Sequence, residues 1–138
     1  MTEIRCATVV EANALYKDAG YSGRAAPGDL IVAAYRHGEL LAVARLIPQS
    51  GHALWLRHLC TMPAFRKRGT ARALCLWIRN NVRTPVIIFP LPELIPMYQS
   101  AGFRITDADH LPVELARHWA QVKRKYPASE VMSSETEQ

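Results

Sequence analysis

The chain has 138 residues, of which 49% are apolar and 21% charged, values that fit one packed domain and exclude a chain that is disordered throughout. No apolar run approaches the ~18 residues that span a membrane, and residues 1–5 lack the apolar stretch of a secretory signal. We therefore expect a cytoplasmic protein without a membrane partner. Cys6, Cys60 and Cys75 lie in apolar surroundings without metal-type spacing, so we expect buried, reduced thiols and no bound metal.

The net charge of +5 is unevenly distributed along the chain. No acidic residue occurs between Glu39 and Glu93, and that stretch carries these arginines and lysines: Arg45, Arg57, Arg66, Lys67, Arg68, Arg72, Arg79 and Arg83. A central segment of one sign suggests a polyanionic ligand, either a phosphorylated small molecule or a nucleic acid. A solvated basic face without a ligand is the alternative.

The first half of the chain reads as a strand, a helix and an antiparallel meander. Apolar positions at helical spacing follow the first strand, and Gly20 ends the helix. A loop rich in turn-forming residues comes next, and His37-Gly38-Glu39 then separates two apolar, partly β-branched runs in the pattern of a hairpin. The predicted elements are a strand over 4–10, a helix over 11–19 and strands over 29–35, 40–47 and 53–62.

The second half alternates helices with short strands. A helical stripe runs from Thr70 to Val82, and the wholly apolar residues 85–89 are typical of a buried parallel strand. A short helix over 96–101, a strand over 103–106 and a helix over 112–126 complete the prediction. We therefore expect a single α/β domain over residues 1–127. Residues 128–138 are expected to form a mobile polar tail, in which Val131-Met132 could pair with a sheet edge.

The segment from Leu59 to Leu74 combines a strand, a proline-broken turn and an R-x-x-G-x-A element at the start of a helix. The first turn of a helix presents unpaired N–H donors and a partial positive charge. Gly69 lets the backbone approach a ligand closely, and Arg66 and Arg68 add charge at the same place. The residues themselves thus predict an anion cradle suited to a pyrophosphate, although neither G-x-x-x-x-G-K-[ST] nor G-x-G-x-x-G occurs in the chain.

At this point the chain resembles the GCN5-related N-acetyltransferase (GNAT) family. The stretch Thr61-Met62-Pro63-Ala64-Phe65-Arg66-Lys67-Arg68-Gly69-Thr70-Ala71 is similar to the family's acetyl-CoA signature, V-x-P-x-[YF]-R-x-x-G-x-[GA]. The run Tyr98-Gln99-Ser100-Ala101-Gly102-Phe103 matches its Y-x-x-x-G-F element. The resemblance is close from Leu54 to Phe103 and collinear from Ile4 to Trp119.

The resemblance implies a mixed, mostly antiparallel central sheet that splays at a bulge and is flanked by helices. It implies acetyl-CoA as the acyl donor, with its pantetheine arm along Leu59, Cys60 and Thr61. The pyrophosphate would lie on the amides of the cradle, whose implied binding residues are Arg66, Lys67, Arg68, Gly69, Thr70 and Ala71. The implied reaction is the direct attack of a neutral amine on the thioester in a ternary complex, with a backbone N–H near Leu59 or Cys60 at the developing oxyanion.

Two residues are candidates for proton transfer. Tyr98 matches the family's general acid, and a phenol of pKa ~10 protonates a thiolate of pKa ~8.5 at a cost of only about 2 kcal/mol. His58 is the candidate general base, because it lies on the strand expected beside the thioester and is expected to share a face with Leu56 and Cys60. A structural role for His58, a base among His52, Glu39 and Glu93, or a water chain are the alternatives. A covalent intermediate on Cys60 is disfavoured, since no His–Asp partner is evident beside it.

Some positions depart from the family pattern. Thr61 stands where Val or Ile is common, and Leu91 stands where the family often has an asparagine that binds the cofactor. Pro90, Pro92 and Pro96 stiffen the approach to Tyr98. The predicted helix over 112–126 replaces much of the family's final hairpin. Either this helix caps the acceptor site, or the family's last strand is reduced to Val131-Met132.

The acceptor is expected to be a primary amine on a small molecule or a peptide. Arg24, Arg45 and Arg57 would suit an acceptor carboxylate, whereas Asp107 and Asp109 would suit a polyamine or a lysine. The other class of function is a catalytically silent acyl-CoA-binding module or a basic nucleic-acid-binding module. Nucleic acid is the weaker alternative, because aromatic residues scarcely interleave with the cations. A homodimer is compatible with the sequence.

Overall fold

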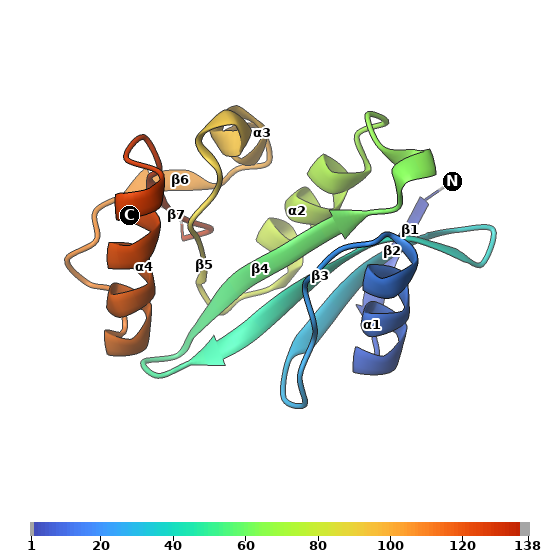
Figure 1. Cartoon of the computed structure of the whole chain (residues 1–138), viewed down its shortest axis with the longest axis horizontal. Helices are drawn as coiled ribbons and strands as arrows, with labels where there is room; N and C mark the ends of the chain where they lie inside the picture. The colour runs from blue at the N-terminus through green and yellow to red at the C-terminus, as the bar shows by residue number, and fades with distance from the viewer. Residues whose placement is uncertain (1, 136–138) are drawn as a thin grey trace.

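The computed structural model describes residues 2–135. Its strands form one seven-stranded sheet in the order β1-β2-β3-β4-β5-β7-β6 (Figure 1). All neighbouring strands are antiparallel except β4 and β5. The predicted mixed α/β class with a mostly antiparallel sheet is therefore confirmed. The strands are β1 (Thr2–Ala7), β2 (Leu30–Arg36), β3 (Glu39–Gln49), β4 (Ala53–Thr61), β5 (Val86–Ile88), β6 (Arg104–Thr106) and β7 (Val131–Ser133).

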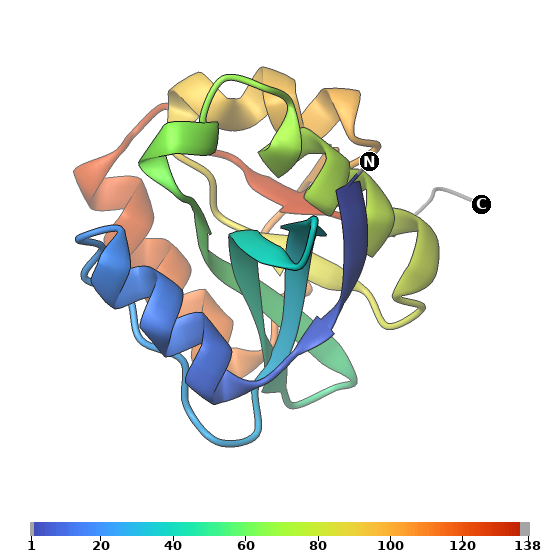
Figure 2. The ribbon, with the colours of Figure 1, turned by 90° about the vertical axis from the view of Figure 1, so that its right-hand side faces the viewer.

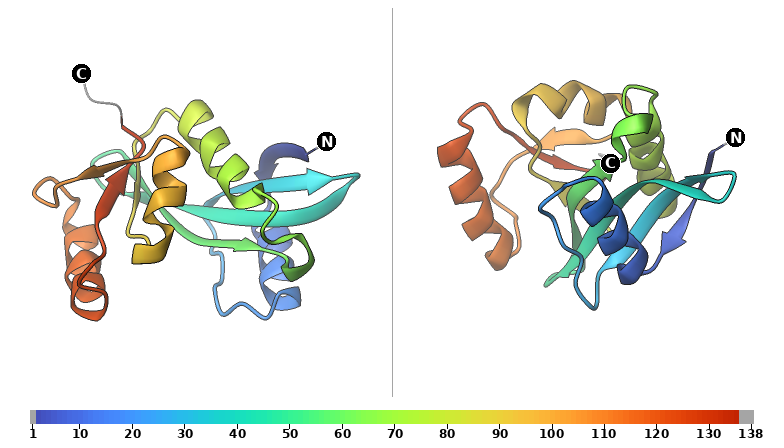
Figure 3. Two further views of the ribbon diagram at one scale, coloured as in Figure 1. Left: turned by 90° about the horizontal axis from the view of Figure 1, so that it is seen from above. Right: turned by 45° about the vertical axis from the view of Figure 1, so that its right-hand side comes forward.

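Four α-helices cover both faces of the sheet, and two short 3-10 turns precede α2 and α3. The left panel of Figure 3 shows α1 and α4 below the sheet and α2 above it, and Figure 2 gives the same arrangement end-on. None of the helices over residues 2–135 is long and apolar enough to span a bilayer. The helices are α1 (Val9–Asp18), α2 (Thr70–Asn81), α3 (Ile95–Ser100) and α4 (Val113–Lys125), and the turns are Pro63–Phe65 and Pro92–Leu94.

Local sequence accounts for the helix ends. Thr8 and Glu11 form a capping box at the start of α1, in which each side chain binds the other residue's backbone N–H. Apolar stripes then attach α1 and α2 to opposite faces. Leu15 and Tyr16 of α1 pack on one face of the sheet, and Leu74 and Ile78 of α2 pack on the other, all four side chains being buried.

The parallel strands β4 and β5 separate soon after they pair. Their pairing is confined to Leu54 with Val86 and Trp55 with Ile87, and beyond these residues the strands diverge (Figure 1). A bulge in β4 accompanies the separation, because Val43 of β3 pairs with Cys60 while Arg45 pairs with Arg57. The extra residue puts His58 at a φ of 55° and bends the strand.

The bulge corrects one expectation about side-chain direction. Leu56 packs in the core beneath α2, whereas Cys60 packs against α1 on the opposite face. The two residues were expected to share a face because side chains alternate along a regular strand. One additional residue between them reverses that alternation.

The C-terminal segment corrects a second expectation. Val131–Ser133 forms the buried strand β7 between β5 and β6, so residues 128–135 are not a mobile tail; residues 136–138 lie outside the described part of the chain. Ser134 adds two hydrogen bonds to Val86, one through its N–H and one through its Oγ. Cys6 differs as well, because it is exposed on the edge strand β1 while Cys60 and Cys75 are buried as expected.

The buried Ser129 offers a test of this C-terminal packing. Its hydroxyl donates a 2.7 Å hydrogen bond to the carbonyl of Pro90. We expect Ser129→Ala to lower the free energy of unfolding by about 1–3 kcal/mol, because a buried carbonyl loses its partner. Urea denaturation of Ser129→Ala beside the exposed control Glu135→Ala measures this, and equal midpoints for the two variants would show that the segment is not packed.

Candidate active site

The first pocket lies between the end of β4 and the start of α2 and has a volume of about 440 Å³. It brings together most of the residues predicted to hold acetyl-CoA. None of the described residues that line it is acidic, and Arg68 is the one predicted residue missing from its wall. The lining residues are Tyr21, Leu59, Cys60, Thr61, Phe65, Arg66, Lys67, Gly69, Thr70, Ala71, Arg72, Leu94 and Met97.

Backbone N–H groups form the floor of this pocket at the start of α2. The first intrahelical bond of α2 runs from the N–H of Ala73 to the carbonyl of Gly69. Within residues 2–135 the N–H groups of residues 67–72 have no hydrogen-bond acceptor. Lys67 and Gly69 both adopt positive φ, 64° and 79°, which turns the chain into the helix. Successive free N–H groups at a helix start bind phosphate oxygens, so this segment has the predicted form of an anion cradle.

The arginines around the cradle also tie its elements together. The Nε of Arg66 donates to the carbonyl of Thr61 at 3.2 Å, which links the turn to the end of β4. Arg72 donates to the hydroxyl and the carbonyl of Ser100, both at 3.0 Å, which joins α2 to α3. The guanidinium of Arg68 lies 5.7 Å from the centroid of the Phe65 ring. Two of these side chains thus brace the cradle as well as supplying its charge.

A second pocket of about 400 Å³ lies where β4 and β5 diverge. It shares Tyr21, Leu59 and Leu94 with the first pocket, so the two pockets adjoin, and together they are called the groove below. Its other lining residues are Trp55, Leu56, Arg57, Ile88, Phe89, Pro90, Leu91, Tyr98, His118, Gln121 and Val122. The groove therefore leads from the anion cradle to Tyr98.

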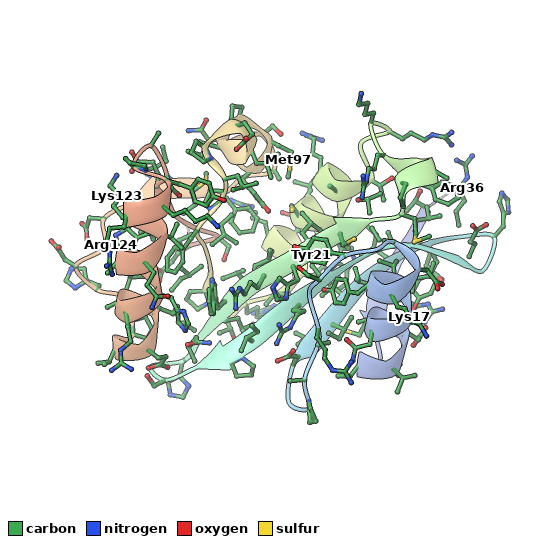
Figure 4. All side chains as sticks on the ribbon, in the orientation of Figure 1. Lys17, Tyr21, Arg36, Met97, Lys123 and Arg124 are labelled. Carbon is green, nitrogen blue, oxygen red and sulfur yellow. The ribbon has the colours of Figure 1, made fainter. Side chains whose placement is uncertain are left out.

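Tyr21 forms a wall common to both pockets. Its ring stacks on Tyr16 with centroids 5.4 Å apart and meets His58 nearly edge-on at 5.8 Å. A Cβ at Gly23 would lie 2.5 Å from the Tyr21 ring, so glycine is needed there to leave room for it. Figure 4 shows Tyr21 near the middle of the molecule. Burial raises the pKa of its hydroxyl, which therefore remains neutral.

Tyr98 places a protonated hydroxyl at the second pocket. Its side chain is buried on α3, and its ring packs edge-on against Phe103 with centroids 6.0 Å apart. Burial raises the pKa of Tyr98 well above its ordinary value. No residue of the described chain accepts or donates a hydrogen bond at this hydroxyl, so its proton is available to a bound molecule.

His58 lies outside the walls of both pockets. Its Nδ1 is 2.9 Å from a guanidinium nitrogen of Arg45, and Arg45 is held by Asp29 at 2.8 Å through a buried ion pair. A guanidinium can only donate, so Nδ1 accepts and the proton of the neutral ring is on Nε2. The carbonyl of His58 accepts a 2.6 Å hydrogen bond from the hydroxyl of Tyr16. These contacts fix the residue at the bulge of β4.

The surroundings of His58 predict how stability changes with pH. Burial, with Arg57 and Arg45 nearby, lowers its pKa from 6.5 to about 4, while Asp29 acts in the opposite direction. Between those values the unfolded chain binds the proton more readily than the folded one. The stabilisation is therefore fully present above pH 6.5 and is lost as the pH falls towards 4.

We expect His58→Asn to remove that pH dependence, because asparagine does not titrate and tolerates the positive φ. The measurement is the difference in free energy of unfolding between pH 7 and pH 5, from urea denaturation. This difference should be smaller in His58→Asn than in the unchanged chain. His52→Asn, at an exposed turn position of positive φ, is the matched control. Identical pH dependence in all three proteins would contradict the lowered pKa of His58 in the folded chain.

Comparisons with known proteins now bear on this geometry. A sequence model of the acetyltransferase (GNAT) family matches residues 3–103. The chain belongs to the GNAT acetyltransferase family. No curated protein matches the sequence.

Among solved structures, GNAT acetyltransferases share the fold. N-acetylglutamate synthase from Neisseria gonorrhoeae, complexed with coenzyme A and N-acetyl-glutamate, aligns with a TM-score of 0.66 and 14% identity over 96% of this chain and 34% of its own. The chain thus spans about a third of that synthase. The ribosomal-protein-S18-alanine N-acetyltransferase from Escherichia coli aligns with a TM-score of 0.62 and 14% identity, covering 96% of this chain and 92% of its own. IAA acetyltransferase from Bacillus cereus aligns with a TM-score of 0.62 and 13% identity, covering 96% and 98%.

The residues beyond the family match complete the second pocket of this GNAT chain. His118, Gln121 and Val122 lie at i, i+3 and i+4 on α4, which places one face of that helix on the pocket. Of the two alternatives for the C-terminal region, the reduced last strand is confirmed as β7, and α4 contributes one face to the second pocket. Sequence reasoning named α4 as a possible cap, but no motif singled out its three lining residues.

The charged residues considered for the acceptor separate in the structure. Arg57 lines the second pocket, whereas Arg45 is bound to Asp29 and His58. Asp107 accepts a hydrogen bond from the backbone N–H of Asp109, and neither aspartate lines the groove. The groove is thus without an acidic side chain among the described residues.

Proposed function

We propose that this GNAT chain transfers an acetyl group from acetyl-CoA to a primary amine by direct attack in a ternary complex. The observation that carries the proposal is the groove formed by the two adjoining pockets, which extends from the free N–H groups at the start of α2 to the side chain of Tyr98. One half of the groove has the chemistry of a pyrophosphate site, and the other half has room for a small acceptor.

The diphosphate of acetyl-CoA is assigned to the N–H groups of residues 68–71, with Arg66, Lys67 and Arg72 at the walls. The pantetheine arm is assigned to Leu59, Cys60 and Thr61. Past Trp55, β4 has no pairing with β5, so its edge is open to an extended ligand. The residues present fit this ligand, because the walls of the first pocket join positive charge with apolar surface.

Tyr98 is assigned the role of proton donor to the departing thiolate. The side chain is buried, and the hydroxyl is neutral and has no intramolecular partner in the described chain, so it can donate to a bound thiolate. Burial in the same pocket also raises the pKa of a thiol, which favours transfer of the proton to it. A backbone N–H at the bulge near Leu59 is assigned to the developing oxyanion.

The amine must lose a proton before it attacks, and the second pocket favours the neutral form. Its described walls are mainly apolar, carry no carboxylate and include the positive charge of Arg57, all of which lower the pKa of a bound ammonium group. His58 is poorly placed as the base, since Nδ1 is engaged by Arg45 and the ring is not part of either wall. We therefore assign the proton to water and give His58 the structural role of holding the bulge.

Two measurements test this proposal. Acetyl-CoA at about 100 times its Kd should add roughly 2.7 kcal/mol to the free energy of unfolding and raise the Tm. An oligonucleotide in excess should not, because aromatic residues scarcely interleave with the cations of the central segment. Release of free coenzyme A thiol with a panel of amines should then be catalytic. Stabilisation by acetyl-CoA without thiol release would favour a silent binding module, and stabilisation by the oligonucleotide alone would favour the nucleic-acid alternative.

A further inference from the structure

The second pocket contains one cation and no compensating anion. Arg57 is the only arginine or lysine among its described lining residues, and no aspartate or glutamate is among them. The other walls are apolar or aromatic, apart from the amide of Gln121 and the His118 ring. At about 400 Å³ the pocket lies at the small end of the ~300–1,000 Å³ usual for ligand sites.

The positive charge of Arg57 has no carboxylate partner in the described chain, because the nearby carboxylate of Asp29 binds the adjacent Arg45. Arg45 and Arg57 are register partners on neighbouring strands, so their side chains emerge side by side on one face. Asp29 pairs with Arg45 at 2.8 Å, and no carboxylate of the described chain pairs with Arg57. Arg57 is exposed, and partial burial of its side chain together with the charge of Arg45 lowers its pKa. An anionic ligand group would relieve this repulsion.

The guanidinium group of Arg57 lies over the ring of Trp55. Its central carbon lies 4.6 Å from the centroid of the Trp55 ring. The Trp55 ring in turn contacts His118 at 4.7 Å and Phe89 at 5.8 Å between centroids, so rings from β4, α4 and the segment after β5 form one wall. Walls built from aromatic rings bind apolar and aromatic side chains.

We infer that the acceptor is a free amino acid with an apolar or aromatic side chain, whose carboxylate binds Arg57 and whose side chain packs on the wall formed by Trp55, Phe89 and His118. This inference rests on the proposed transferase function. The amine then faces the part of the groove shared by Leu59 and Tyr98. Polyamines do not fit, because the described pocket has no carboxylate for a second ammonium group, and a lysine side chain of a peptide has no carboxylate beside its amine. A peptide N-terminus lacks the adjacent carboxylate that Arg57 requires.

Matched amines with and without the carboxylate test the inference. We expect kcat/KM for L-phenylalanine to exceed that for 2-phenylethylamine by about 10-fold or more, since a hydrogen-bonded charge pair is lost. L-leucine and 3-methylbutylamine form a second pair, and glycine tests the aromatic wall. The dipeptide Phe-Gly and spermidine represent the peptide and polyamine alternatives. Equal or greater kcat/KM for amines without the carboxylate would overturn the inference.

Variants at Arg57 show whether this residue causes the preference. Arg57→Gln should lower the ratio of kcat/KM for phenylalanine to that for phenylethylamine by about 10- to 100-fold, and Arg57→Lys should lower it less. Arg83→Gln, an exposed arginine beyond the C-terminal end of α2, should leave the ratio unchanged. An unchanged ratio in Arg57→Gln would overturn the assignment.

A binding measurement separates failure of this inference from failure of the proposed function. Calorimetric titration of N-acetyl-phenylalanine into the protein saturated with coenzyme A should show binding that Arg57→Gln weakens at least 10-fold. If acetyl-CoA neither stabilises the protein nor loses its acetyl group to any amine, the transferase function itself is wrong. If simple amines are acetylated and N-acetyl-phenylalanine does not bind, only the acceptor class is wrong.

Discussion

Replacing Tyr98 with phenylalanine is expected to lower kcat by about 10²–10⁴-fold, the usual contribution of a positioned general acid. The thiolate of coenzyme A would then leave without a proton donor. Stability should change by less than about 0.5 kcal/mol, because no hydrogen bond of the described chain is lost and the ring still packs against Phe103. Thiol release at saturating amine and acetyl-CoA measures kcat.

A matched control for Tyr98→Phe is Tyr35→Phe. The hydroxyl of Tyr35 donates to Glu11 at 2.8 Å on the far side of the sheet from Tyr98, so its loss affects stability and not the groove. Normal kcat in Tyr35→Phe with a large loss in Tyr98→Phe would support the proton-donor role. If Tyr98→Phe releases thiol at the unchanged rate, another group supplies the proton.

Thr70→Glu is expected to weaken acetyl-CoA binding by at least about 100-fold while the fold remains as stable or becomes more stable. The new carboxylate would occupy the cradle and repel the diphosphate. The same charge at the first residue of α2 interacts favourably with the helix dipole, by about 0.3–1 kcal/mol. If Thr70→Glu weakens acetyl-CoA binding while it maintains or raises the free energy of unfolding, the start of α2 binds phosphate. A helix end with only a structural role would show no loss of binding.

The matched control is Thr70→Gln, which has the same size without the charge. Thermal unfolding with and without acetyl-CoA measures both quantities in one experiment. Thr70→Gln should keep most of the stabilisation by acetyl-CoA, and Thr70→Glu should lose it. Full stabilisation of Thr70→Glu would place the diphosphate elsewhere.

Features encoded by neighbouring residues could be predicted from the sequence. The helix predicted over 112–126 is α4, because its apolar residues recur on one face and Pro127 ends it. The turn before α2 was predictable for a similar reason, since glycine at position 69 permits the positive φ found there and Pro63 fixes the backbone before it. Tyr98 could be placed at the groove because its motif spans only six residues.

Features that depend on pairing between distant segments could not be predicted in this way. The bulge at His58 arises when β4 pairs with β3 and the pairing shifts by one residue. The sequence of β4 by itself predicts a regular alternation of side chains, so it does not reveal the bulge. Strand β7 has three residues, too few to be stable alone, and it forms because β5 and β6 bind it on both sides.

For the charge of the central segment as well, one part could be predicted from the sequence and another part depends on the tertiary structure. Its eight basic residues and lack of acids, read directly from the chain, pointed to an anionic ligand. Which arginine is free to bind one was decided in three dimensions, because Asp29 lies 16 positions before Arg45 and reaches it only when β2 pairs with β3. Sequence thus determined the turn of the cradle through local backbone geometry, and the resemblance to the GNAT motif pointed to Tyr98. Long-range pairing decided that Arg57, and not Arg45, presents its charge to the groove.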